Sequence, residues 1–87
     1  MEAPKKFRSK PVQMEAMQYT GKNAEQIAKW TGEGVLEHRT WDPVNLHIKT
    51  REGLTVCEPN AWVCKDSEGG FYPCADSIFR RKYEEVK

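Results

Sequence analysis

The side chains best suited to chemistry in this chain are its three cysteines and two histidines, namely Cys57, Cys64, Cys74, His38 and His47. Zinc sites usually contain close cysteine pairs, because one turn must present two ligands in a tetrahedral arrangement. The intervals here are wider, so the sequence predicts no metal site, and nothing in it indicates a cofactor. We expect three reduced thiols, since an odd number of cysteines cannot all pair within one chain.

A cysteine nucleophile would need a base within hydrogen-bond reach and a partner that orients the base. His38 and His47 are the only histidines, and each falls at a polar position of a strand pattern, where we expect it to face solvent. The chain contains no glycine-rich phosphate loop and no recognisable pair of catalytic carboxylates. The sequence therefore favours a protein that is not an enzyme.

Tryptophan provides the first candidate binding surface. Trp41 lies in a predicted turn with Arg39 and Asp42 as polar neighbours, and Trp30 lies at the edge of a helical apolar stripe. Most large aromatic side chains of a small domain belong to its core, but Trp41 is difficult to place there. An exposed tryptophan suits a protein-binding hot spot or the stacking of a base, so we expect binding around Trp41.

Basic side chains provide the alternative, a nucleic-acid-binding surface. They gather at the two ends of the chain, as Lys5, Lys6, Arg8 and Lys10 and as Arg80, Arg81 and Lys82. The formal net charge is only +1, so no global field would draw the protein to nucleic acid. The simplest interpretation of these runs is a flexible tail over residues 1–9 and a solvated face near the end.

The first half of the chain predicts one strand, one helix and the start of a hairpin. Residues 10–20 alternate apolar and polar side chains, as in a half-buried strand. Asn23 is a candidate N-cap for a helix that ends near Thr31, before Gly32. Residues 35–39 and 44–49 then have strand patterns, and in the second of them Val44, Leu46 and Ile48 alternate with polar residues.

The second half predicts a meander of antiparallel hairpins. Residues 50–53 form a turn into a strand over residues 54–57, and residues 66–69 join strands over 61–65 and 70–74. Asp76 is a candidate cap for a short helical turn, after which residues 82–86 are extended. The prediction is an α+β fold: an N-terminal strand and a capped helix, antiparallel β-hairpins, and a short C-terminal helical turn.

Size and composition limit the classes of protein. The 87 residues, of which 38% are hydrophobic and 31% charged, suit one modest domain over residues 10–87. No apolar run approaches the roughly 20 residues that span a bilayer. We therefore expect a cytoplasmic protein with no membrane partner, present as a monomer or small homo-oligomer.

Two segments resemble a family of small bacteriophage and prophage proteins. Residues 7–21, FRSKPVQMEAMQYTG, resemble the family's RKKPVxIEAxQFTG start, and residues 62–79, WVCKDSEGGFYPCADSIF, followed by Tyr83 and Glu84, resemble its DWIVKGxxGEFYPCKPDIFExxYE close. Residues 58–61 replace a Pro-Gly-Asp turn of many relatives, and residues 75–77 replace Lys-Pro-Asp. The family has no established function, so the resemblance implies a phage origin and the cytoplasm of a host cell, and no chemistry.

The expected function is therefore non-enzymatic binding, in which a phage protein modulates a host protein or sequesters a small signalling ligand. Nucleic-acid binding is the alternative, and an enzyme or a component of the virion stays open because no motif decides among them.

Overall fold

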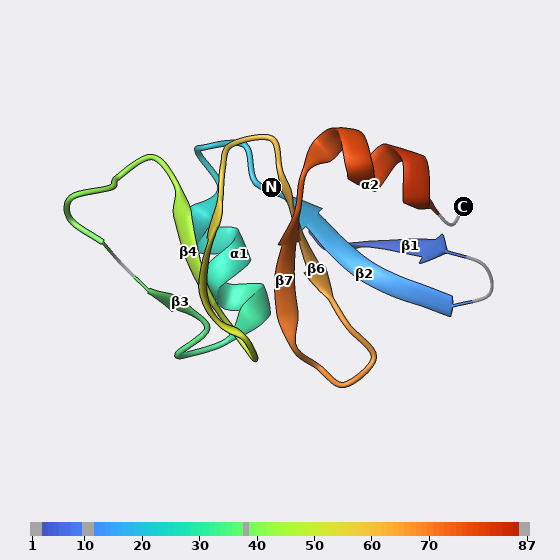
Figure 1. Cartoon of the computed structure of the whole chain (residues 1–87), viewed down its shortest axis with the longest axis horizontal. Helices are drawn as coiled ribbons and strands as arrows, with labels where there is room; N and C mark the ends of the chain where they lie inside the picture. Colours follow the sequence, from blue (N-terminus) through green and yellow to red (C-terminus); the bar gives the residue numbers. More distant parts are fainter. Residues whose placement is uncertain (1–2, 10–11, 38, 86–87) are drawn as a thin grey trace.

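A computed structural model describes residues 3–9, 12–37 and 39–85, and only the backbone of residues 6–9, 12, 13, 84 and 85. The described chain forms two antiparallel sheets and two short helices (Figure 1). A five-stranded sheet has the order β7-β6-β2-β1-β8, and a three-stranded sheet has the order β3-β4-β5. The predicted α+β class is confirmed.

The elements follow the chain in a simple order. They are β1 (Lys5–Ser9), β2 (Val12–Gln18), α1 (Ala24–Thr31), β3 (Leu36–Glu37), β4 (Leu46–Thr50), β5 (Gly53–Cys57), β6 (Trp62–Lys65), β7 (Phe71–Cys74), α2 (Asp76–Lys82) and β8 (Glu84–Glu85). Both predicted hairpins are present, as β4 with β5 and as β6 with β7. The predicted strand over residues 35–39 shortens to β3, and His38 lies outside the described residues.

Two apolar clusters stabilise the fold, one on each face of the five-stranded sheet. Neighbouring side chains of a strand point to opposite faces. On β2, Met17 therefore joins a cluster with Ile27 of α1 and Ile48 of β4, whereas Ala16 joins a second cluster with Phe79 of α2. One face of the sheet is thus covered by α1 and the three-stranded sheet, and the other face by α2.

Asn23 does not cap α1 in the predicted way, because its side chain makes no bond to the first turn of the helix. The side chain is 2% exposed and points back along the chain. Its Oδ1 accepts from the Thr20 amide at 2.8 Å, and its Nδ2 donates to the Gln18 carbonyl at 2.8 Å. Asn23 therefore fixes the connection between β2 and α1.

Asp76 also differs from its predicted role as a cap. Ala75 occupies the N-cap position of α2, and no side chain there bonds the first turn. The Asp76 carboxylate instead accepts from Trp62 Nε1 at 2.8 Å and from Arg80 Nε at 2.9 Å. It therefore attaches α2 to β6, where Trp62 stacks on Phe79 with ring centroids 4.2 Å apart.

The flexible tail expected over residues 1–9 is replaced over residues 5–9 by strand β1. This strand pairs with β2 on one side and with β8 on the other. The register places Arg8 opposite Glu84, so the basic start and the acidic end of the chain adjoin in one sheet. Residues 1–2 and 10–11 lie outside the described residues.

Candidate binding surface

Trp41 lies in the loop between β3 and β4, which projects from one end of the molecule (Figure 1). Its side chain is 73% exposed, the largest exposure among the large hydrophobic residues that the structure describes. The indole still has a defined neighbour, because its ring packs edge-on against His47 with centroids 5.4 Å apart. The exposure predicted from the sequence is confirmed, whereas a role in binding stays a prediction.

Asp42 organises this loop through its carboxylate. The carboxylate accepts from the Asn45 amide at 3.3 Å, from Asn45 Nδ2 at 3.2 Å and from His47 Nε2 at 2.8 Å. The hydrogen bond from His47 is the main reason that the pKa of Asp42 lies below its ordinary value. Asp42 therefore stays ionised at neutral pH and holds the residues after Trp41 against β4.

A second anchor joins the loop to the core. Tyr19 is 3% exposed, and its hydroxyl donates to the Val44 carbonyl at 2.6 Å. Burial is the main cause that raises the pKa of Tyr19, so the hydroxyl keeps the proton that it donates. Before Trp41, the Arg39 carbonyl accepts from the Asp42 amide at 3.0 Å. After Pro43, the Val44 carbonyl accepts from Tyr19. The loop is thus held on both sides of Trp41.

His47 is the residue that sequence reasoning placed wrongly. It was expected to face solvent, but it is 4% exposed. Its strand neighbours Leu46 and Ile48 fill the inner face of the sheet, and the Trp41–Asp42 segment covers the outer face above His47. Alternation predicted the correct face for His47 but not the loop that covers it.

The outer face of the three-stranded sheet continues this apolar surface toward β5. Val56 lies directly opposite His47 in the register, and Leu54 lies two residues earlier on the same face. Val56 is 45% exposed and Leu54 is 42% exposed. We call Trp41, Leu54 and Val56, with His47 beneath Trp41, the outer sheet face.

The other residues predicted with Trp41 do not all belong to this face. Arg39 is half-buried and pairs with Glu37 at 3.1 Å, close to the start of the loop. Its Nε is buried and has no hydrogen-bond partner in the described part of the chain. Trp30 packs edge-on against Phe71 at 5.2 Å and contacts the core below the sheet. Trp30 and Trp41 therefore lie on opposite sides of the three-stranded sheet.

The basic residues of the alternative hypothesis are placed only in part. Lys5 is exposed, and so are Arg80, Arg81 and Lys82 in the last turn of α2. The structure gives the backbone of Lys6 and Arg8 in β1, and Lys10 lies outside the described residues. Arg80 is already paired with Asp76.

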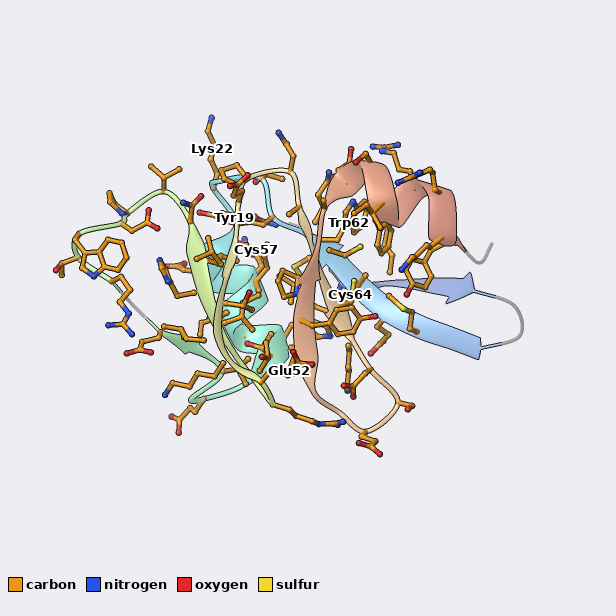
Figure 2. The ribbon with its side chains drawn as sticks, viewed as in Figure 1. Tyr19, Lys22, Glu52, Cys57, Trp62 and Cys64 are labelled. Carbon is orange, nitrogen blue, oxygen red and sulfur yellow. The ribbon has the colours of Figure 1, made fainter. Side chains whose placement is uncertain are left out.

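The three cysteines are free thiols that belong to the packing of the strands. Cys57 and Cys64 are fully buried, and burial raises the pKa of each to about 12 (Figure 2). Cys74 is half-buried, and burial raises its pKa as well. Within residues 3–9, 12–37 and 39–85, no three His, Cys, Asp or Glu side chains group in a way that could hold a metal ion.

Comparisons with known proteins add no relative. No protein family, no curated protein and no solved structure matches the chain. No helix in the described part of the chain is long and apolar enough to cross a membrane.

Proposed function

We propose that this chain is a non-enzymatic binding protein of phage origin that modulates a host protein through the outer sheet face, with Trp41 as the anchor. The supporting observation is the combination of a 73% exposed indole with a loop that hydrogen bonds hold on both sides. Tryptophan is enriched among binding hot spots. A loop that is already ordered loses little conformational freedom on binding.

The polar anchors supply the second part of the argument. Asp42 uses its carboxylate to hold Asn45 and His47 in place. In the loop that these contacts hold, Trp41 lies outside the core, although Trp30 shows that a tryptophan can pack against the core of this same domain. Beyond its contact with His47, the arrangement leaves most of a large apolar side chain in water, which benefits a binding surface more than it benefits folding.

The test compares partner capture by three forms of the full-length chain. Immobilised wild-type, Trp41→Ala and Ile78→Ala chains are incubated with bacterial lysate, and captured proteins and small molecules are quantified by mass spectrometry. Ile78 is the matched control, because it is 39% exposed but lies on α2, which covers the opposite face of the five-stranded sheet.

We expect Trp41→Ala to lower the affinity for a captured protein by about 2 kcal/mol, or roughly thirtyfold, and Ile78→Ala to leave it unchanged. Equal capture by all three forms would contradict the proposal. Selective capture of a small molecule in place of a protein would favour ligand sequestration.

Nucleic-acid binding is the second candidate, and one observation favours it. Strand β1 pairs with β8, which follows α2 directly, so the two basic segments approach each other at one edge of the five-stranded sheet. Phosphate contacts release counterions, so such binding should weaken steeply with salt. Fluorescence anisotropy with single-stranded and double-stranded oligonucleotides would decide. This candidate would be excluded if the binding constant did not change with salt concentration, or if the Arg81→Ala/Lys82→Ala variant bound as tightly as the wild type.

A further inference from the structure

Strand β5 lies at one edge of the three-stranded sheet. The hydrogen-bonding pattern of that sheet shows which backbone N–H and C=O groups of β5 face outward. The Lys49 amide donates to the Val35 carbonyl at 2.8 Å, so Lys49 points its backbone groups toward β3. Successive residues of an antiparallel strand alternate in this respect, so Ile48 points toward β5, where it pairs with Thr55. The backbone N–H and C=O groups of Leu54 and Val56 therefore face away from β4.

In the part of the chain that the structure describes, no strand pairs with this edge of β5. A groove of about 800 Å³ lies at the β4–β5 turn and beside the first half of β5, where Leu54 and Thr55 line it together with Phe71, Tyr72 and Pro73 of β7. Arg51 bridges the two hairpin turns at one end of the groove by pairing with Asp66 at 3.4 Å and with Glu68. The first half of the edge thus borders the groove, and the ion pairs of Arg51 join the two hairpin turns at its end.

The other edge strands in the described residues are poor templates for pairing. β3 and β8 contain two residues each. In β7, Pro73 lies opposite Val63. The Asp66 amide donates to the Gly70 carbonyl at 2.8 Å, so Gly70 faces β6 and, by alternation, the backbone nitrogen of Pro73 faces the free edge. Proline has no N–H there to donate to another strand. β5 has five residues, with no proline and no charged side chain, so it lacks the usual protection of an edge.

The charged side chains at the two ends of β5 indicate which kind of strand would pair with its free edge. Glu52 and Glu58 are exposed and flank the strand, with Glu52 at the hairpin tip (Figure 2). If a second copy paired antiparallel over the full strand, Leu54 would face Val56 and Glu52 would face Glu58, which places like charges opposite each other at both ends. Such pairs are destabilising, whereas a basic residue opposite each glutamate is favourable.

We propose that the edge of β5 binds an extended segment of a partner protein, in which alternate apolar residues are flanked by a basic residue at each end. The segment pairs antiparallel, exchanges backbone hydrogen bonds with Leu54 and Val56, and places its apolar side chains beside theirs on the outer sheet face. This mode of recognition adds a strand to a sheet. The inference rests on the proposed function and specifies the form of the partner.

The first test uses two synthetic heptapeptides, acetyl-Lys-Thr-Val-Thr-Val-Thr-Lys-amide and the same peptide with glutamate at both ends. Each is labelled with a fluorophore and titrated with the full-length chain. We expect the lysine-ended peptide to bind about tenfold more tightly, and the double variant Glu52→Lys/Glu58→Lys to reverse the preference. Equal affinities, or no binding of the lysine-ended peptide, would overturn the proposal.

The second test identifies the backbone groups. Saturating lysine-ended peptide should slow amide hydrogen exchange at Leu54 and Val56 and change it little at Thr55, whose amide already faces β4. Val56→Pro removes only an outward donor, so it should abolish binding while the circular dichroism spectrum is retained. Val56→Thr is the matched control, because it keeps the donor and should bind. Binding without protection of these amides would refute strand addition.

Further outcomes separate this inference from the proposed function. If lysate capture depends on Trp41 but neither peptide binds, the inference fails and the proposed function stands. If the peptide protects Leu54 and Val56 but capture is insensitive to Trp41→Ala, the proposed function fails. A dimer in sedimentation that Val56→Pro dissociates would show that a second copy occupies the edge, which would overturn the assigned partner.

Discussion

Replacing Tyr19 with phenylalanine removes one oxygen atom from the anchor of the Trp41 loop. The Tyr19 side chain is 3% exposed, and its only hydrogen bond in the described structure is the 2.6 Å contact to the Val44 carbonyl. Tyr19→Phe keeps the ring in the core and leaves this carbonyl without its protein donor. The substitution therefore tests the anchor without opening a large cavity.

The expected cost follows from the type of bond that is lost. A hydrogen bond between neutral groups contributes about 1 kcal/mol net to stability, with a usual range of roughly 0.5–1.5 kcal/mol. Val44 is 58% exposed, so water can replace part of the lost donor. We expect the free energy of unfolding to fall by about 1 kcal/mol, which lowers Tm by about 4–8 °C in a domain of this size.

Tyr72→Phe is the matched control. The Tyr72 hydroxyl lies 3.9 Å from Met14 Sδ and 3.5 Å from the Tyr83 hydroxyl, and both of these contacts are longer than the 2.6 Å bond of Tyr19. Urea denaturation followed by circular dichroism should show a smaller loss for Tyr72→Phe than for Tyr19→Phe. Amide exchange at Asp42 and Asn45 should become faster only in Tyr19→Phe. An equal or larger loss for Tyr72→Phe, or unchanged exchange in the loop, would refute the anchor.

Three further predictions concern turns and buried groups. Gly69→Ala should lower the free energy of unfolding by about 1 kcal/mol, because Gly69 has φ +86°, whereas Ser67→Ala in the same turn should change it little, as thermal denaturation can check. Asn23→Asp should cost roughly 1–3 kcal/mol by urea denaturation, because the Gln18 carbonyl loses its buried donor; a neutral result would favour the helix-cap interpretation. Burial raises the pKa of both Cys57 and Cys64 from 9.0 to about 12, so the unfolded chain loses these two thiol protons at a lower pH than the folded chain does. The free energy of unfolding should therefore fall as pH rises through this range, and Cys57→Ala/Cys64→Ala should make its dependence on pH shallower.

The sequence predicted the helix and the hairpins because their signals are local. Gly32 ends α1 with φ +92°, and Gly53 begins β5 with φ +119°, both conformations that favour glycine. Strand β1 was missed for the opposite reason. Its lysine and arginine residues have the composition of a solvated tail, and its partners β2 and β8 become visible only when the two ends of the chain are brought together.

The two helix starts show that side chains of the capping types can bond groups outside the first turn of their helix. Asn23 and Asp76 both precede or begin a helix, as capping residues do, and both have the expected side-chain types. Each side chain instead bonds a group outside its helix, the Gln18 carbonyl for Asn23 and the Trp62 indole for Asp76. Local propensity therefore located the helix starts correctly and assigned the wrong partners.

The candidate site divides in the same way between local and long-range information. The turn residues around Trp41 were enough to predict its exposure, which the structure confirms. The burial of His47 could not be predicted, because it depends on the same turn folding back over β4. The open edge of β5 could not be predicted either, because it depends on the register of three strands. Trp41 is distinguished by the exposure of its side chain, and the β5 edge by its outward-facing backbone hydrogen-bonding groups. They lie on one sheet, with Trp41 above His47 of β4 and Val56 of β5 directly opposite His47. A partner strand on β5 would therefore extend the sheet whose outer face Trp41 already marks, so a single partner can contact both features at once.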